Sequence, residues 1–306
     1  MMDLTAAIVI MVSISVLAFT LGLQTGNDSR RRRILAQIIS VMLMVGYCMF
    51  LWNRPVLTRL LPGSDLVIVG NWLPLWGSFF LGFCLASRSI PRWRKTALFF
   101  PAVAFCFYSI VAPVLGQPPR CEAAVGGKLL QHQTTPYTCS AACAASLLRL
   151  HNIAATEEEL ARLSLTREGT HWMGLYRGLN MKVQGTGWQV VVEPFDPGRL
   201  DQLPFSPSIL ALRMDVSQFE EGVDHGFRDD CGHSVVYLGR PAADRIAVFD
   251  PSPDFGIEEW DTQIMSCISD GVIMTLVPTD HAHPKSAAVT RNVAAVMLNR
   301  PLTAGL

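Results

Sequence analysis

The sequence predicts an α+β domain that follows about four membrane-spanning helices. Half of the 306 residues are hydrophobic, and the mean hydropathy is +0.31. Residues 1–120 carry 11 lysines and arginines against 3 acidic residues, whereas the remainder carries 14 against 22. After residue 130, helical patterns come first and short β-branched runs follow. A basic, apolar first part and an acidic second part indicate a membrane region joined to a water-soluble domain.

The membrane region is predicted from long apolar runs, each close to the ~20 residues that cross a bilayer as a helix. The first run has no basic residues before it, and Arg30 to Arg33 follow it. It is therefore interpreted as a retained spanning helix and not as a signal peptide. We assign residues 1–116 to this region, in contact with bilayer lipid. The apolar runs are 5–23, 34–52, 66–86 and 96–115.

The charges of the short loops predict the orientation of these helices. Loops rich in lysine and arginine stay in the cytoplasm. The first and third loops are basic, whereas the second holds only Arg54 and Arg59 with Asp65. Both ends of the membrane region then face outward, so the following domain is predicted to be extracytoplasmic, on a bacterial inner (plasma) membrane. The basic residues of the first and third loops are Arg30 to Arg33, Arg88, Arg92, Arg94 and Lys95.

The rest of the chain divides into a linker (117–130), a domain (131–278) and a C-terminal tail (279–306). The linker contains Gly126-Gly127, which is either a flexible hinge or a site of self-cleavage. In the domain, an alanine-rich helix is expected over 139–150. Thr156, with Glu159 three residues later, has the spacing of a capping box and predicts the start of a second helix.

A third helix is expected within 170–180, and the pattern then changes to strands. Five short β-branched runs are separated by Pro, Gly and Asp, which is typical of an antiparallel sheet. The tail has one weak helical stretch over 286–299. The predicted strands are 188–193, 208–213, 233–238, 245–250 and 272–277.

Cys139, at the start of its predicted helix, is a candidate nucleophile. A helix N-terminus stabilises the thiolate, which also needs a base and a group that orients the base. A hairpin centred near residues 241–242 would place His233 opposite Asp250, with directly opposed side chains ~5 Å apart. Gln133 could join the Cys139 backbone N–H in stabilising an oxyanion.

Four segments in this order resemble the papain-like cysteine peptidases that process bacteriocins by cutting after double-glycine leaders. The resemblance covers about residues 131–277. It implies a papain-like fold and a peptide or protein substrate. It also implies Cys139 as nucleophile, His233 as general base and acid, Asp250 as the orienting group and Gln133 as oxyanion donor. The segments are "QTTPYTC", "LTREGTHWMGLYRGLN", "GHSVV" and "AVFDP".

The sequence departs from this family in three places. The family's usual Asp-Cys-Gly is Thr138-Cys139-Ser140 here, and the Ser140 side chain is expected to narrow the approach to the cleft. Residues 215–231 form an acidic insertion before the histidine. The sequence has no GxxxxGK[ST] phosphate loop, so no ATP-driven exporter function is expected.

The other cysteines and histidines have simpler interpretations. Cys143 lies among alanines and is expected in the core. Cys231 is either buried or paired with Cys121 or Cys267 in an oxidising compartment. His225, Cys231-Gly-His233 and His281-Ala-His283 lack a compact metal-ligand spacing, so neither a metal nor another cofactor is expected. The acidic domain also argues against nucleic acid as a partner.

These observations favour a membrane-anchored cysteine peptidase that processes leader peptides or secreted proteins. One alternative is a non-catalytic, regulatory module that binds a peptide and presents it to a membrane protein partner. Another is a thiol-dependent acyl transferase or amidase, because attack by the thiolate and stabilisation of the oxyanion are common to these reactions.

Overall fold

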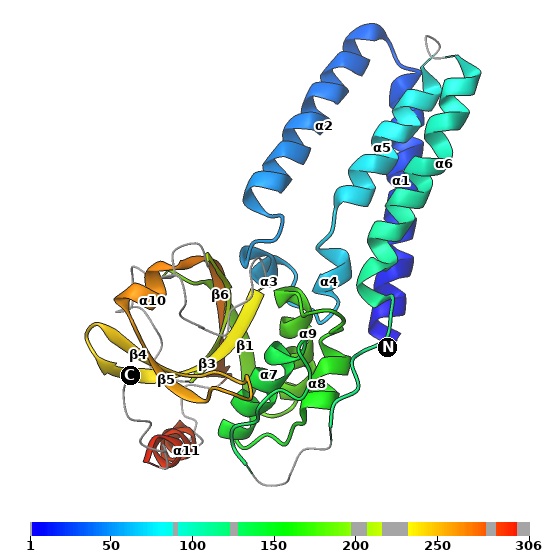
Figure 1. The fold of residues 1–306 in the computed structure, drawn as a ribbon. Coiled ribbons are helices and arrows are strands. Elements are labelled where there is room, and N and C mark those ends of the chain that lie inside the picture. Colours follow the sequence, from blue (N-terminus) through cyan, green and yellow to red (C-terminus); the bar gives the residue numbers. More distant parts are fainter. Residues whose placement is uncertain are drawn as a thin grey trace. The chain divides into compact units, whose positions relative to one another are not determined.

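The computed structural model describes residues 2–87, 91–122, 128–196, 207–215, 232–279 and 286–298. The chain forms two compact units, residues 1–115 and 116–306, and each is described by itself (Figure 1). Several residues singled out in the sequence lie outside the described residues. They are Arg88, Gly126, Gly127, His225, Cys231, His281, His283 and the insertion after Asp215.

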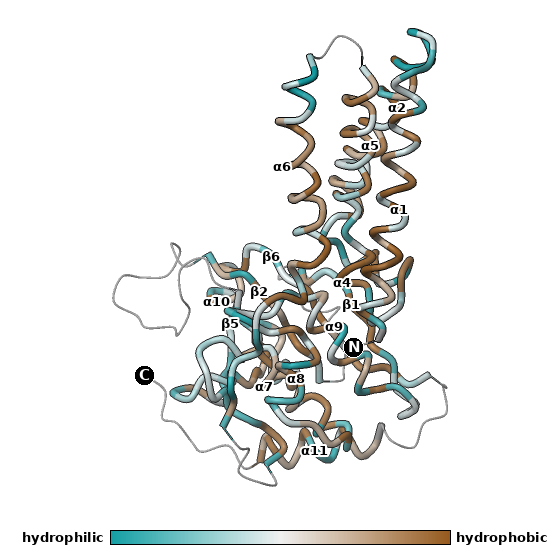
Figure 2. Tube along the Cα trace, turned by 90° about the vertical axis from the view of Figure 1, so that its right-hand side faces the viewer, coloured by the Kyte–Doolittle hydropathy of each residue, from teal (hydrophilic) through white to brown (hydrophobic). Residues whose placement is uncertain are grey.

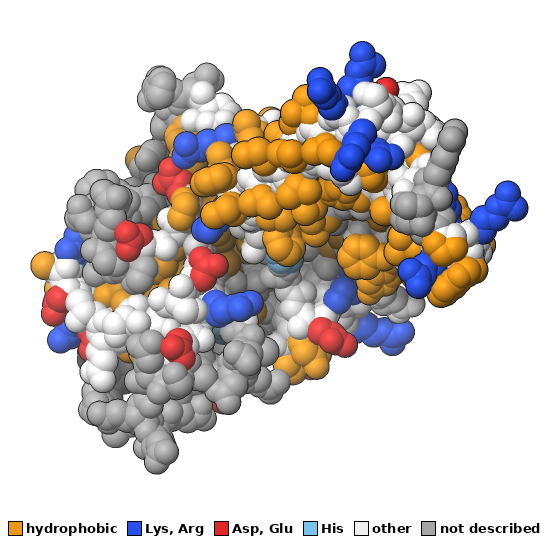
Figure 3. All heavy atoms as spheres, turned by 90° about the horizontal axis from the view of Figure 1, so that it is seen from above, with side chains coloured by type: hydrophobic (Ala, Val, Ile, Leu, Met, Phe, Trp, Pro, Cys, Tyr) orange, Lys and Arg blue, Asp and Glu red, His pale blue; other side chains and the backbone are white. Residues whose placement is uncertain are grey.

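The N-terminal unit is helical, with four helices that are long and apolar enough to cross a membrane by length and composition. They span Asp3–Gly26, Arg30–Phe50, Leu66–Ala86 and Arg92–Val114. Hydrophobic residues dominate their traces in Figure 2, and hydrophobic side chains form rows on the face seen in Figure 3. The predicted apolar N-terminal helices are therefore confirmed. The elements are α1 (Met2–Gly26), α2 (Arg30–Phe50), α3 (Val56–Leu60), α4 (Leu66–Val69), α5 (Leu73–Ala86), α6 (Arg92–Val111) and the 3₁₀ helix η1 (Ala112–Val114).

Helices α1 and α5 approach closely through glycines. A Cβ atom on Gly22 would lie 2.1 Å from the Phe79 carbonyl oxygen, and one on Gly82 would lie 2.2 Å from that of Phe19. Small residues commonly allow such close backbone contact between membrane helices, where van der Waals packing drives association.

The C-terminal unit begins with three helices, α7 (Cys139–Leu150), α8 (Glu157–Leu163) and α9 (Trp172–Val183). Helix α7 has the predicted bounds, and its small residues are buried. Thr156 caps α8 as expected, since its side chain accepts a 3.2 Å hydrogen bond from the Glu159 N–H. Helix α9 starts later than predicted because His171 is its N-cap, accepting from the Met173 N–H at 3.3 Å.

The strands form one six-stranded sheet in the order β1-β6-β2-β3-β4-β5, and every described pairing is antiparallel. Helix α7 packs against β3 (Figure 1). This mixture of helices and antiparallel sheet confirms the α+β class. The elements are β1 (Trp188–Pro194), β2 (Ser208–Met214), β3 (Gly232–Ala242), β4 (Arg245–Phe249), β5 (Ile257–Asp261), α10 (Thr262–Ser266), β6 (Ile268–Pro278) and α11 (Ser286–Leu298).

The register of the β3–β4 hairpin differs from the predicted one. The pairs Val236↔Phe249 and Ala242↔Arg245 place the turn at residues 243–244, with irregularities on either side of Gly239. Continuing the pairing of Val236 places Asp250 opposite residue 235, so the prediction that it lies directly opposite His233 was wrong. The displacement is two residues, and an even displacement keeps both side chains on one face of the sheet.

Candidate active site

Cys139 is the first residue of α7 and is partly buried. The turn before it is held by the Thr138 hydroxyl, which donates to the Thr135 carbonyl oxygen at 3.0 Å. The Thr138 carbonyl oxygen then accepts from the Ala142 N–H at 2.9 Å and starts the helix. The sulfur therefore lies at the positive end of a 12-residue helix, which favours a thiolate.

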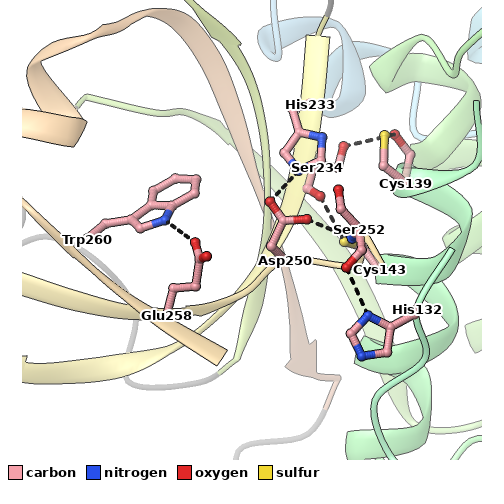
Figure 4. Close-up of polar contacts among 10 residues, drawn as sticks. His132, Cys139, Cys143, His233, Ser234, Asp250, Ser252, Glu258 and Trp260 are labelled. Carbon is pink, nitrogen blue, oxygen red and sulfur yellow. Dashed lines mark hydrogen bonds and ion pairs between the residues drawn. The ribbon is translucent and has the colours of Figure 1, made fainter. Parts of the chain in front are cut away.

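His233 and Asp250 form a hydrogen-bonded pair beside Cys139. The His233 Nε2 atom lies 2.8 Å from Asp250 Oδ2, and the other carboxylate oxygen accepts from the Ser252 N–H at 2.7 Å. Because Asp250 occupies Nε2, Nδ1 is the ring nitrogen left for a thiol. His233 also acts on the Cys139 side chain, whose pKa it lowers. Figure 4 shows the three side chains converging from β3, the end of β4 and α7.

The electrostatics of these side chains favour a thiolate–imidazolium pair. Burial raises the pKa of Cys139, but the hydrogen bond and positive charge of His233 outweigh burial, so the pKa falls below its usual value. Burial lowers the pKa of His233, whereas Asp250 and Cys139 raise it to about 10. Burial raises the pKa of Asp250, but His233 and Ser252 lower it by more, so the pKa falls below its usual value. Opposite charges in contact stabilise each other's charged forms.

The Ser140 side chain is buried beside Cys139, with its hydroxyl 3.9 Å from the Cys139 sulfur. Ser140 is 4% exposed, and its hydroxyl lies 2.8 Å from the Ser234 hydroxyl across the α7–β3 contact. Cys143, one turn further along α7, is fully buried and donates to the Ser234 carbonyl oxygen at 3.1 Å. Burial raises the Cys143 pKa well above its usual value, as suits a core thiol.

Gln133 lies beside the Asp250 loop, because its N–H donates to the Pro251 carbonyl oxygen at 2.7 Å. Its Oε1 atom is buried and has no hydrogen-bond partner among the described residues. Within the same residues, no hydrogen bond joins its side chain to Cys139. Its role as oxyanion donor therefore stays a prediction.

Glu258 on β5 was not predicted from the sequence, and its carboxyl group lies near the His233–Asp250 pair. It pairs in register with Val248 and accepts a 3.0 Å hydrogen bond from the Trp260 indole N–H (Figure 4). Burial raises its pKa, and it interacts electrostatically with Asp250 and His233. Without a prediction of β5, the sequence offered no way to place this side chain near His233.

The described part of the chain contains neither a disulfide nor a cluster of metal-ligating residues. Its cysteines are all free thiols, and Cys267 is buried whereas Cys121 is partly exposed. Because Cys231 lies outside that part, its pairing stays a prediction. No group of three or more His, Cys, Asp or Glu residues among those described could hold a metal ion.

Comparisons with known proteins give structural matches only; no family model and no curated protein matches the chain. The peptidase domain of Streptococcus ComA, a bi-functional ABC transporter involved in quorum sensing, matches at 18% identity and TM-score 0.39, over 49% of this chain and 98% of that one. The peptidase domain of Streptococcus mutans ComA matches at 17% identity and TM-score 0.33, over 49% of this chain and 100% of that one. A double glycine motif protease from an AMS/PCAT transporter, in complex with the leader peptide, matches at 15% identity and TM-score 0.34. The match covers 53% of this chain and 94% of that one.

Proposed function

We propose that the protein is a membrane-anchored cysteine peptidase with a papain-like domain and a triad of Cys139, His233 and Asp250. The observation that carries the proposal is the arrangement around His233, which hydrogen-bonds Asp250 at 2.8 Å and interacts electrostatically with Cys139, the first residue of α7. A nucleophile, a base and a group that orients the base are the parts that thiol catalysis requires. The position of Cys139 at a helix N-terminus adds a further stabilisation of the thiolate.

In the first half of the proposed reaction, the Cys139 thiolate attacks the carbonyl carbon of a peptide bond. The carbonyl oxygen becomes an oxyanion, which accepts hydrogen bonds from the Cys139 backbone N–H and the Gln133 side-chain amide. His233, held by Asp250, gives its proton to the leaving nitrogen as the C–N bond breaks. The products of this half are a free amine and a thioester on Cys139.

In the second half, neutral His233 takes a proton from water, and the hydroxide attacks the thioester carbonyl. The same oxyanion donors act again, and the C–S bond breaks to release a carboxylic acid. The thiolate and the imidazolium are thereby restored. Leader peptides and secreted proteins are the proposed substrates, since the domain is proposed to be extracytoplasmic.

Replacement of Cys139 tests the proposed activity. In the full chain purified in detergent, Cys139→Ala is expected to abolish hydrolysis of p-nitrophenyl acetate and of a quenched fluorescent peptide with an internal Gly-Gly. The matched control is Cys121→Ala, because Cys121 is a partly exposed thiol of the same unit. Equal activity of Cys139→Ala and wild type would exclude Cys139 as the nucleophile.

Reporter fusions test the proposed orientation. Alkaline phosphatase, active only outside the cytoplasm, is fused after Gly26, Leu60, Ser87 or Arg120. Activity is expected from the Leu60 and Arg120 fusions and not from the other two, because basic short loops stay in the cytoplasm. An inactive Arg120 fusion, with a green fluorescent protein fusion at the same site fluorescent, would place the domain in the cytoplasm and contradict this orientation.

A further inference from the structure

Glu157, the first residue of α8, is a buried carboxylate that holds both ends of the segment 131–134. It is 1% exposed. Its Oε1 atom accepts from the Thr134 N–H at 2.8 Å, and its Oε2 atom accepts from the Gln131 side-chain amide at 3.2 Å. Gln133, the proposed oxyanion donor, lies between these two residues. A carboxylate with two oxygens can make both contacts at once, which fixes the segment in position and direction.

The same segment is attached to α7 and to the Asp250 loop. The Gln131 N–H donates to the Ser146 hydroxyl of α7 at 2.9 Å. The Gln133 N–H donates to the Pro251 carbonyl oxygen at 2.7 Å, and the His132 ring lies 3.0 Å from the Ser252 carbonyl oxygen. The segment thus bridges the helix that begins at Cys139 and the loop that follows Asp250. Glu157 fixes it to α8, the third element.

We infer that Glu157 is a positioning residue for the oxyanion donor, an inference that rests on the proposed function of Cys139 and Gln133. An oxyanion donor acts only where its N–H meets the developing charge, and its effect depends on being held there before the reaction. Glu157 holds the Gln131 side chain on one side of Gln133 and the Thr134 backbone on the other, so loss of its two contacts loosens the segment that carries the donor. The thiolate does not depend on these contacts, because they involve neither Cys139 nor His233.

Two reagents separate donor positioning from thiolate formation. Acylation of Cys139 by p-nitrophenyl acetate passes through a tetrahedral oxyanion, whereas alkylation by iodoacetamide displaces iodide and forms none. Both need the thiolate. A variant that misplaces Gln133 slows acylation and leaves alkylation unchanged. The rates are measured on the full chain in detergent, with Cys139 followed by peptide mass spectrometry so that the other thiols do not contribute.

Three substitutions of Glu157 distinguish a positioning role from an effect of its charge. Glu157→Leu removes both acceptors, and Glu157→Asp keeps the charge but draws the oxygens back by one methylene. Glu157→Gln loses the charge but retains an acceptor for Thr134. Its new amide can donate to Gln131 Oε1, which is buried and has no hydrogen-bond partner among the described residues, once the Gln131 amide turns over. The matched control is Glu158→Leu, an exposed position of the same helix.

Acylation is expected to fall by about 10- to 100-fold in Glu157→Leu and Glu157→Asp, short of the ~10²–10³ lost with a whole donor. Glu157→Gln and Glu158→Leu are expected to stay within about threefold of wild type, with alkylation unchanged in all four. The Glu157→Leu effect is expected to disappear in a Gln133→Ala background, since residues that act through one another are not additive. Should Glu157→Leu fail to fold, Glu157→Asp gives the same comparison.

Unchanged acylation in Glu157→Asp would overturn the inference. So would equal losses of acylation and alkylation, or full additivity with Gln133→Ala. A normal rate in Gln133→Ala would also overturn it, since Glu157 would then have no donor to position. Failure of the proposed function gives a different result, because wild type itself would then neither acylate at Cys139 nor alkylate at pH 6.

Discussion

Replacement of His233 by Ala is expected to lower turnover of p-nitrophenyl acetate at pH 7 by about 10²–10⁴-fold, the usual contribution of a general acid–base. The variant also loses the main influences that lower the pKa of Cys139, the hydrogen bond and the charge of His233. Burial remains and raises that pKa, so the thiol becomes neutral at pH 7. Base and thiolate are therefore lost together.

His171→Asn is the matched control for this variant. His171 is a histidine of the same unit that caps α9, and Asn is also a good N-cap, so the helix start is kept. The control is expected to retain wild-type turnover. If His233→Ala and His171→Asn gave the same turnover as wild type, His233 could not be the base.

The buried histidine His151 is expected to make the C-terminal unit sensitive to acid. It is 2% exposed, its Nδ1 atom lies 2.8 Å from the Leu147 carbonyl oxygen, and its ring packs edge-on against Trp188. Burial lowers its pKa to about 4. An unfolded histidine titrates near ~6.5, so between these values the unfolded state binds more protons. The contribution of His151 to the free energy of unfolding is complete above pH 6.5 and is lost as the pH falls toward 4.

The expected loss from this residue is about 3.5 kcal/mol when the pH falls from 6.5 to 4, since the two pKa values differ by roughly 2.5 and each unit corresponds to ~1.4 kcal/mol. His233 acts in the opposite direction: its pKa is raised to about 10, so its contribution is present below pH 6.5 and declines as the pH rises toward 10. The measurement is urea unfolding of the full chain in detergent at pH 4.5 to 7, for wild type and His151→Leu. A smaller fall in the free energy of unfolding is expected in the variant. Equal falls in both proteins would show that the pKa of His151 is the same in the folded and unfolded states.

The helices at the site followed from local signals in the sequence. The run of small residues after Cys139 predicted α7 with its observed bounds, and the spacing of Thr156 and Glu159 predicted the cap of α8. Both signals depend only on residues within one or two turns of each other. The strands that carry His233 and precede Asp250 were found for the same reason, since their β-branched runs are continuous.

Features that depend on contacts between elements were missed. The β3–β4 turn lies at residues 243–244, two residues later than predicted, and the irregular pairing on either side of Gly239 sets the register beyond it, which no local pattern specifies. Strand β5 carries Glu258, Glu259 and Asp261, a charged composition unlike a typical strand. The burial of Ser140 arises from its contact with Ser234, 94 residues further along the chain. Likewise, the contacts of Glu157 are to Gln131 and Thr134 in the segment before α7, 26 and 23 residues away in the sequence.

The pH dependence of Cys139 alkylation tests the central claim most directly. Wild-type and His233→Ala chains are treated with iodoacetamide from pH 5 to 10, and modified Cys139 is quantified by peptide mass spectrometry. A free thiol titrates near ~8.5 and is only ~0.3% thiolate at pH 6. We expect rapid alkylation of wild type at pH 6 and a rise only above pH 8 in His233→Ala. A rise only above pH 8 in both proteins would contradict the account and assign Cys139 to the core.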